Sequence, residues 1–219
     1  MREETVTSPV QMDTCIALLR GVNVGGKNLL PMKQLTAVFE ELGAESVKTY
    51  IQSGNVIFRH RHTDLTNLAK KIGVEILKRF GFEPHILVIT LTDLESAMRS
   101  NPFPEAESTP NLLHIGFLSS TPQAPDLTKL ENLKKDSERF QLIGRFFYLH
   151  APEGVGRSKL ASSSERLLGV PITDRNWNTV CKLQELTTAC DSQPDRHRLP
   201  EKAGLAGQLP ARDANKAKL

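Results

Sequence analysis

Residues 47–58 read VKTYIQSGNVIF, and this stretch separates two fold classes for the chain. Val47, Thr49 and Ile51 alternate with Lys48, Tyr50 and Gln52, residues 53–55 (SGN) form a turn, and residues 56–58 (VIF) return, which is typical of a β-hairpin. Nucleotide-binding α/β folds instead repeat strand and helix without hairpins. The stretch therefore predicts an α+β protein.

The segments on either side of the hairpin complete a β-α-β-β-α-β order. Residues 14–20 (TCIALLR) are apolar on both faces, which predicts a central strand. Helical spacing follows Pro31 as far as Gly43, and a second helical stripe ends at Gly81. Residues 85–90 (HILVIT) then predict a buried strand.

The second half of the sequence repeats this order. Residues 112–118 predict a strand, residues 140–149 a hairpin, and residues 158–168 a helix that ends at Gly169, with a short strand at 170–172. A capping box at 92–95 predicts a short helix after the first unit, and Asp174 or Asn176 is suited to cap a last helix. The expected fold is α+β, with two consecutive ferredoxin-like β-α-β-β-α-β subdomains. The expected boundaries are a disordered extension (1–12), a first subdomain (13–100), a linker (101–110), a second subdomain (111–189) and a disordered tail (190–219).

Composition narrows the function classes. The 219 residues carry a formal net charge of +3 and a sequence pI of about 8.8, which allows an anionic partner without requiring one. The three cysteines show neither zinc-site spacing nor a disulfide framework, and the HRH segment at 60–62 lacks a third metal ligand. No apolar stretch is long enough to span a bilayer, and residues 1–12 have no signal-peptide core. We expect a cytoplasmic protein without metal or cofactor.

Residues 20–28 (RGVNVGGKN) match the phosphate-loop pattern G-x-x-x-x-G-K-[ST] at every position except Asn28. A phosphate loop needs a hydroxyl for Mg²⁺ at that position and a helix directly after the lysine, whereas Pro31 places the helix start several residues beyond Lys27. An NTP-hydrolysing loop is thus disfavoured. Two alternatives stay open: an anion-binding loop of another kind, and a structural turn that uses Gly for positive φ and Asn for hydrogen bonds to the backbone.

Four segments resemble a known family when they are taken together. ALLRGVNVGGKN (17–28), PMKQL (31–35), TYIQSGNVIF (49–58) and RNWNTV (175–180) have the order and similar spacing found in the bacterial family called domain of unknown function 1697. The resemblance covers about residues 13–189. It implies a two-subdomain protein built from ferredoxin-like units, and it brings no established activity.

The polar residues of these segments supply the candidate site. The anion-binding candidates are Arg20, Asn23, Gly25, Gly26, Lys27, Asn28, Arg175, Asn176 and Asn178. Further candidates are Tyr50, Gln52, Ser53, Asn55 and Trp177. The alternative roles are structural, because an asparagine at a helix start can be a cap, and a tryptophan at helical spacing is more often a core residue. Residues 156–159 (GRSK) form a basic helix start, which we interpret as a solvated turn. We expect the SGN turn near the end of the sheet opposite to RGVNVGG, which would separate the two sets.

Three functional hypotheses follow. The one we favour is binding of a phosphorylated ligand or nucleic acid through RGVNVGGKN. The second is an enzyme for a small anionic metabolite, with Arg20 and Lys27 as electrostatic clamps. The third is a protein-interaction module whose glycine-rich turns are structural. Whether Arg20 and Lys27 share a cleft with Arg175 and Asn178 decides whether a common anion site is credible.

Overall fold

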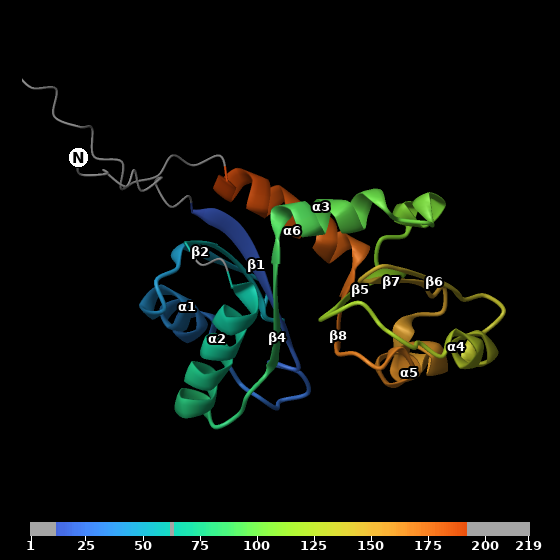
Figure 1. The fold of residues 1–219 in the computed structure, drawn as a ribbon, viewed down its shortest axis with the longest axis horizontal. Helices are drawn as coiled ribbons and strands as arrows, with labels where there is room; N and C mark the ends of the chain where they lie inside the picture. The colour runs from blue at the N-terminus through green and yellow to red at the C-terminus, as the bar shows by residue number, and fades with distance from the viewer. Residues whose placement is uncertain (1–11, 62–63, 192–219) are drawn as a thin grey trace, which may run out of the picture.

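Two four-stranded antiparallel sheets organise the chain into two halves, as Figure 1 shows for the computed structural model. The structure describes residues 12–61 and 64–191. Of the regions expected to lack order, residues 1–11 and 192–219 lie outside the described residues, as do residues 62–63 of the HRH segment. The predicted α+β class, with repeated β-α-β units, is confirmed.

The first half has the strand order β2-β3-β1-β4, and its helices α1 and α2 cover one face of the sheet. Its elements are β1 Asp13–Arg20, α1 Met32–Glu41, β2 Glu45–Tyr50, β3 Asn55–His60, α2 Leu65–Phe80 and β4 His85–Thr90. Leu35 and Phe39 of α1 and Ile72 of α2 are fully or almost fully buried against the sheet. Local signals set the ends of α2: the Asp64 carboxylate accepts from Asn67 N–H at 2.9 Å, and Gly81 ends the helix at φ 77°.

The second half repeats the arrangement with the strand order β6-β7-β5-β8. Its elements are β5 Leu113–Leu118, α4 Leu127–Leu133, β6 Arg139–Ile143, β7 Phe146–His150, α5 Lys159–Leu168 and β8 Ile172–Asn176. Leu130 of α4 and Leu160 of α5 are fully buried in the core of this half. The last strand is longer than the sequence indicated, because it runs to Asn176 and therefore includes Arg175.

A third layer joins the halves. Helices α3 (Leu91–Arg99) and α6 (Trp177–Asp191) lie together across the top of Figure 1, and their apolar side chains share one core with both sheets. The Tyr148 hydroxyl of β7 donates a 2.6 Å hydrogen bond to the Ala97 carbonyl of α3. Each half thus has a core of its own, and a third core is shared between them. Helix α6 also includes Cys190 and Asp191, which the sequence analysis assigned to the tail.

Between the halves the chain forms a short 3₁₀ helix, Pro104–Ser108, where the sequence indicated a linker. The helix before it starts earlier than expected. Its capping box is formed by Thr90 and Asp93, not by residues 92–95. A second 3₁₀ helix, Val155–Arg157, leads directly into α5.

The expected position of the SGN turn is wrong. Strands β1 and β3 are antiparallel, with Leu18 opposite Asn55, and Leu19 N–H donates to the Gly54 carbonyl at 2.7 Å. The start of β3 therefore lies beside the end of β1, so the SGN turn and the glycine-rich segment occupy the same end of the sheet. That β1 and β3 are neighbours does not by itself determine the end at which the SGN turn lies. The antiparallel direction of the pair determines it.

Candidate functional site

The glycine-rich segment after β1 folds into a small hairpin of its own. Asn23 N–H donates to the Asn28 carbonyl and Lys27 N–H to the Val24 carbonyl, each at 3.1 Å. Gly25 and Gly26 both have positive φ, at 58° and 73°, which is the requirement of a type I′ two-residue turn. These backbone donors are directed into the hairpin itself, whereas a phosphate loop directs its donors at the anion.

The asparagine side chains hold this hairpin in place. The Asn23 amide donates to the carbonyls of Leu30 (2.9 Å) and Gln52 (3.0 Å), and its oxygen accepts from Leu30 N–H at 2.7 Å. The Asn28 amide donates to the Gly21 carbonyl at 2.9 Å. Lys27 is exposed near the tip. Asn23 and Asn28 thus fit the structural-turn alternative, and Asn23 also connects the hairpin to the turn between β2 and β3.

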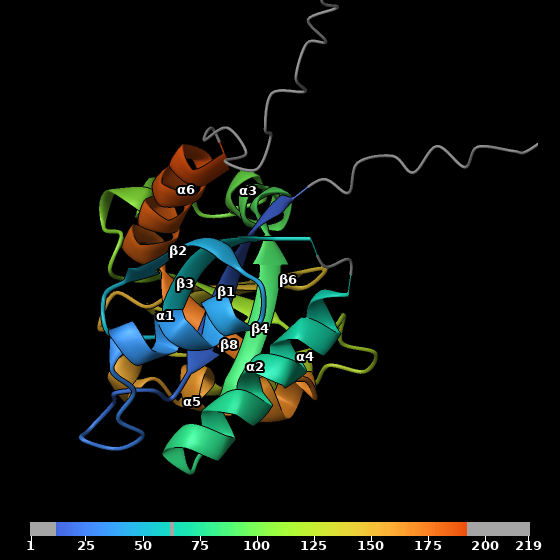
Figure 2. The same cartoon turned by 90° about the vertical axis from the view of Figure 1, so that its left-hand side faces the viewer.

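A cleft of about 650 Å³ lies between the two halves, beside this hairpin. Figure 2 shows the loop after β1 and the helix α5 at the same end of the molecule. One wall comes from the first half: Leu19, Arg20, Gly21, Val22, Val24 and Ser53. The other wall comes from the second half: Phe147, Leu149, Val155, Gly156, Arg157, Ser158, Lys159, Ala161, Ser162, Ser164, Glu165, Ile172, Asp174 and Arg175. The structure therefore brings Arg20, Ser53 and Arg175 together.

Arg175 connects β8 of the second half to the first. Its Nε donates to Asn55 Oδ1 at 2.6 Å, and its Nη2 donates to the Leu19 carbonyl at 2.8 Å. Its Nη1 donates to the carbonyl of Asp174 at 2.7 Å. Burial lowers the pKa of the guanidinium to about 10, because the surrounding carbonyls replace only part of its hydration. Arg175 is thus mainly a tie between the halves, with its charge at the cleft wall.

Both carboxylates of the cleft have basic partners. Glu165 forms an ion pair with Arg20, and Asp174 Oδ2 lies 2.7 Å from His114 Nδ1. Burial alone would lower the pKa of His114, but the hydrogen bond and charge of Asp174, with the Asn111 carbonyl on the other ring nitrogen, raise it above its ordinary value. Once these pairs are counted, Arg157 and Lys159 are the cationic groups of the lining that have no carboxylate partner among the described residues, while the charge of Arg175 interacts with that of its neighbour Asp174.

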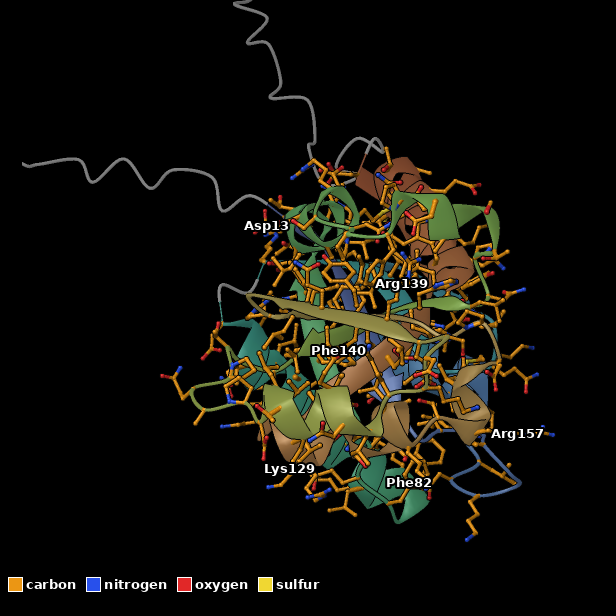
Figure 3. The ribbon with its side chains drawn as sticks, turned by 90° about the vertical axis from the view of Figure 1, so that its right-hand side faces the viewer. Asp13, Phe82, Lys129, Arg139, Phe140 and Arg157 are labelled. Carbon is orange, nitrogen blue, oxygen red and sulfur yellow. The ribbon has the colours of Figure 1, made fainter. Side chains whose placement is uncertain are left out.

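Arg157 and Lys159 flank the start of α5, where backbone donors are also available. Ser158 caps the helix, with its Oγ accepting from Ala161 N–H at 3.0 Å. Within the described residues, the N–H group of Lys159 has no acceptor, as expected for the first turn of a helix, whereas Leu160 is fully buried and does not line the cleft. Both cationic side chains are exposed, and Figure 3 shows Arg157 at the outer edge of the molecule, next to the loop that follows β1. The segment 156–159, interpreted from sequence as a solvated turn, therefore forms a cleft wall.

The other predicted residues lie outside this cleft or support its frame. The Asn55 amide donates to the Tyr50 carbonyl and to Ser53 Oγ, at 3.3 and 3.0 Å, which fixes the SGN turn. Asn176 caps α6 through Thr179 N–H at 2.9 Å, and Trp177 is buried in the shared core. Gly25, Gly26, Lys27, Asn28, Asn178, Tyr50 and Gln52 are likewise absent from the cleft lining.

Sequence reasoning missed Glu165 and Asp174. An acidic residue on a helix surface or at a strand end carries no local signal of a cleft, because the cleft forms only when the two halves meet. Among the described residues, no group of three or more His, Cys, Asp or Glu side chains is arranged to hold a metal ion. Nor is any described helix both long and apolar enough to cross a membrane.

Comparison with known proteins agrees with the sequence resemblance. The profile of a family described as "Protein of unknown function (DUF1697)" matches residues 12–148. The chain belongs to this family. The match includes the glycine-rich hairpin and the SGN turn of this DUF1697 protein, and it ends before the start of α5. A search among curated proteins finds no match.

A solved structure of similar fold is described as the structure of conserved bacterial protein SP0830 from Streptococcus pneumoniae. It is 26% identical to the DUF1697 protein, with a TM-score of 0.59. The similarity covers 81% of this chain and 99% of that one. It therefore extends over both halves and supports the two-sheet architecture.

Proposed function

We propose that this DUF1697 protein binds a small phosphate-bearing ligand in the cleft between its halves. The observation that carries the proposal is the charge pattern of the cleft: each carboxylate is paired with a basic side chain, while Arg157 and Lys159 have no carboxylate partner among the described residues. A phosphate group matches such a site because it accepts several charge-assisted hydrogen bonds at once. The N–H group of Lys159, which has no acceptor within the described residues, adds a donor at the positive end of the α5 dipole.

The shape of the cleft supports a small ligand. Its volume of about 650 Å³ is within the usual range for small-molecule sites, which commonly lie between domains. The sheet aromatics Phe117, Phe146 and Tyr148 pack in the core shared by both halves. A protein that binds single-stranded nucleic acid on a sheet needs such rings exposed for base stacking. The small-ligand version of the anion-binding hypothesis is therefore the one we advance.

Two further assignments belong to this proposal. Each half is a ferredoxin-like unit, which is supported by the shared strand orders β2-β3-β1-β4 and β6-β7-β5-β8. The protein acts in a bacterial cytoplasm, which is supported by its similarity to a bacterial protein and by three cysteines that are free in the structure.

Calorimetric titration with inorganic phosphate and with ribose 5-phosphate tests the binding site. Lys159→Ala and Arg157→Ala each remove a charged donor at the start of α5. Since a hydrogen bond to a charged group contributes about 1.5–3 kcal/mol, each variant should bind about 10- to 100-fold more weakly. The thermal midpoint should change little, because both side chains are exposed.

Lys129→Ala is the matched control. Lys129 is an exposed lysine on α4, well away from Arg157 in Figure 3. The Lys129→Ala variant should bind both phosphate compounds with the affinity of the wild type. Full-strength binding by the Arg157 and Lys159 variants would rule out the start of α5 as the anion site. Absence of binding in the wild type at low salt would rule out the proposed function itself.

A further inference from the structure

The cleft has a second polar end, which bears on the kind of phosphate compound it accepts. We propose that the ligand is a nucleoside monophosphate, with its phosphate at the start of α5 and its base at the Arg20–Glu165 pair. This inference rests on the proposed function and narrows it from any small phosphate ester to one that carries a nucleobase.

One face of α5 connects the two ends. Ser158, Ser162 and Glu165 recur at helical spacing and all line the cleft. From Lys159 to Glu165 the helix advances by six residues, or about 9 Å at the usual rise. A phosphate bound near Lys159 is thus separated from Glu165 by a gap that inorganic phosphate cannot span, and a ligand engaging both ends needs an extended body.

The Arg20–Glu165 pair presents an open donor beside an open acceptor. Glu165 Oε2 is the oxygen that meets Arg20 Nη1, and it also accepts from Ile172 N–H at 3.3 Å. Arg20 Nη1 in addition donates to the Ile172 carbonyl at 2.9 Å. Glu165 Oε1 and the Nε and Nη2 groups of Arg20 have no partner among the described residues, and both side chains are about two-fifths exposed, at 41% and 42%.

A nucleobase edge fits this arrangement. Bases carry hydrogen-bond donors and acceptors side by side on their edges, so one edge can donate to Glu165 Oε1 while it accepts from Arg20. Ribose 5-phosphate has hydroxyl groups that can donate or accept, but it lacks a planar edge that holds a donor and an acceptor side by side. The pair therefore favours a base over a sugar, which makes it a determinant of specificity.

The lining also has an apolar part. Leu19, Val22 and Ile172 belong to it but are almost fully buried, while Val24 lies at the hairpin with 63% of its surface exposed. A planar base gains by burying its faces against an exposed apolar side chain such as Val24, whereas a highly hydroxylated sugar would lose hydrogen bonds to water there. The cleft thus combines charged groups with apolar surface, as required by a phosphate, a base and the ring faces of that base.

Isothermal titration of the full chain decides the question. The probes are ribose 5-phosphate and the 5′-monophosphates of adenosine, guanosine, cytidine and uridine. At least one nucleotide should bind about 10- to 100-fold more tightly than ribose 5-phosphate, as expected for hydrogen bonds to charged groups. Nucleotides that bind no better than ribose 5-phosphate would overturn the inference and leave the proposed function intact. If none of the phosphate compounds binds, both are overturned.

Glu165→Gln then locates the base. Arg20 Nη1 and Ile172 N–H both donate to Oε2, so the amide oxygen of the glutamine takes that place and its NH2 group turns the open acceptor into a donor. The nucleotide advantage should therefore disappear while ribose 5-phosphate binds within about 2-fold of wild type. Glu185→Gln on α6 is the matched control, since Glu185 also pairs with a basic side chain but does not line the cleft. A nucleotide advantage that survives Glu165→Gln would place the base elsewhere and overturn the assignment. The wild-type comparison stands even if this variant folds poorly.

Discussion

The glycine-rich segment 20–28 and the basic segment 156–159 lie at the same cleft, yet they use their polar groups in opposite ways. In the first, backbone donors and both asparagine amides bond within the loop and to its neighbouring turn. In the second, Ser158 caps α5 but the N–H group of Lys159 has no acceptor within the described chain. The segment whose sequence matches a phosphate motif has few unpaired donors for an anion, and the segment without a motif has more. Whether each donor is already hydrogen-bonded therefore matters more than whether the sequence matches a motif.

Arg175 connects β8 to the end of β1 and the SGN turn, and its replacement should have the largest effect. Arg175→Leu removes the donors that reach Asn55 and the Leu19 carbonyl, and it leaves those acceptors in a site that water reaches poorly. Each buried acceptor left unpaired costs about 1–3 kcal/mol, so the two together should cost about 2–6 kcal/mol of unfolding free energy. Urea denaturation of the wild type and of Arg175→Leu measures this loss of unfolding free energy.

Arg157→Leu is the comparison variant for Arg175→Leu, because Arg157 is exposed and should change stability by about 0.5 kcal/mol or less. Suppose instead that Arg175→Leu keeps its stability and loses phosphate affinity. Arg175 would then be a ligand-binding group and not a tie between the halves.

The frame that positions both segments was largely predictable from sequence. Apolar periodicity and turn residues gave the element order, since they act over short stretches of chain. The end of the sheet at which the SGN turn lies was not predictable, because it depends on the direction of pairing between β1 and β3. The extension of β8 through Arg175 was also missed, since TDRN has few apolar residues and its pairing with β5 provides the stabilisation.

Gly54 supports the base of the glycine-rich segment, and Gly54→Ala should have the second-largest effect. A Cβ at this position would lie 2.7 Å from both Leu19 Cβ and Val22 Cγ2, and its φ of 74° disfavours any L side chain. The clash and the backbone strain together should cost about 3 kcal/mol. Gly25→Ala separates the two terms, because its φ is 58° but nothing lies within 4 Å, so about 1 kcal/mol is expected. Equal losses in the two variants would contradict the close packing inferred at Gly54.

The candidate site was only half predictable. Arg20, Ser53 and Arg175 were chosen for their residue types and do line the cleft, but Lys27 and Asn178 were chosen in the same way and do not. Glu165 and Asp174 gave no signal, because their partners Arg20 and His114 come from distant parts of the chain. A site between two halves depends on their packing, which local pattern does not encode.

The His114–Asp174 pair involves a carboxylate that lines the cleft, and the pH dependence of stability should reveal the pair. The pKa of His114 is raised in the folded state, so its stabilisation is fully present below the unfolded pKa of about 6.5 and is lost as the pH rises through the higher folded value. Asp174→Asn should therefore destabilise the protein more at pH 5.5 than at pH 8.5, by about 1 kcal/mol or less, since Asp174 is half exposed.

An NMR titration of the His114 ring should show its pKa falling in Asp174→Asn, because burial then opposes the charged form. Asp136→Asn, at an exposed position on the surface, is the control and should leave the His114 titration unchanged. A His114 pKa that is unaffected by Asp174→Asn would mean that Asp174 is not the partner that holds the proton.

Lys27→Ala should have the smallest effect, although the sequence made Lys27 the leading anion candidate. The side chain is exposed near the hairpin tip, does not line the cleft, and its Nζ has no partner within the described chain. Stability should change by about 0.5 kcal/mol or less, and phosphate affinity should stay within about 2-fold at physiological salt, where charges separated by more than about 8 Å are largely screened. Calorimetry beside Lys159→Ala makes the comparison direct. A loss in Lys27→Ala as large as that in Lys159→Ala would mean that the hairpin reaches the bound phosphate, and the contrast between the two segments would then fail.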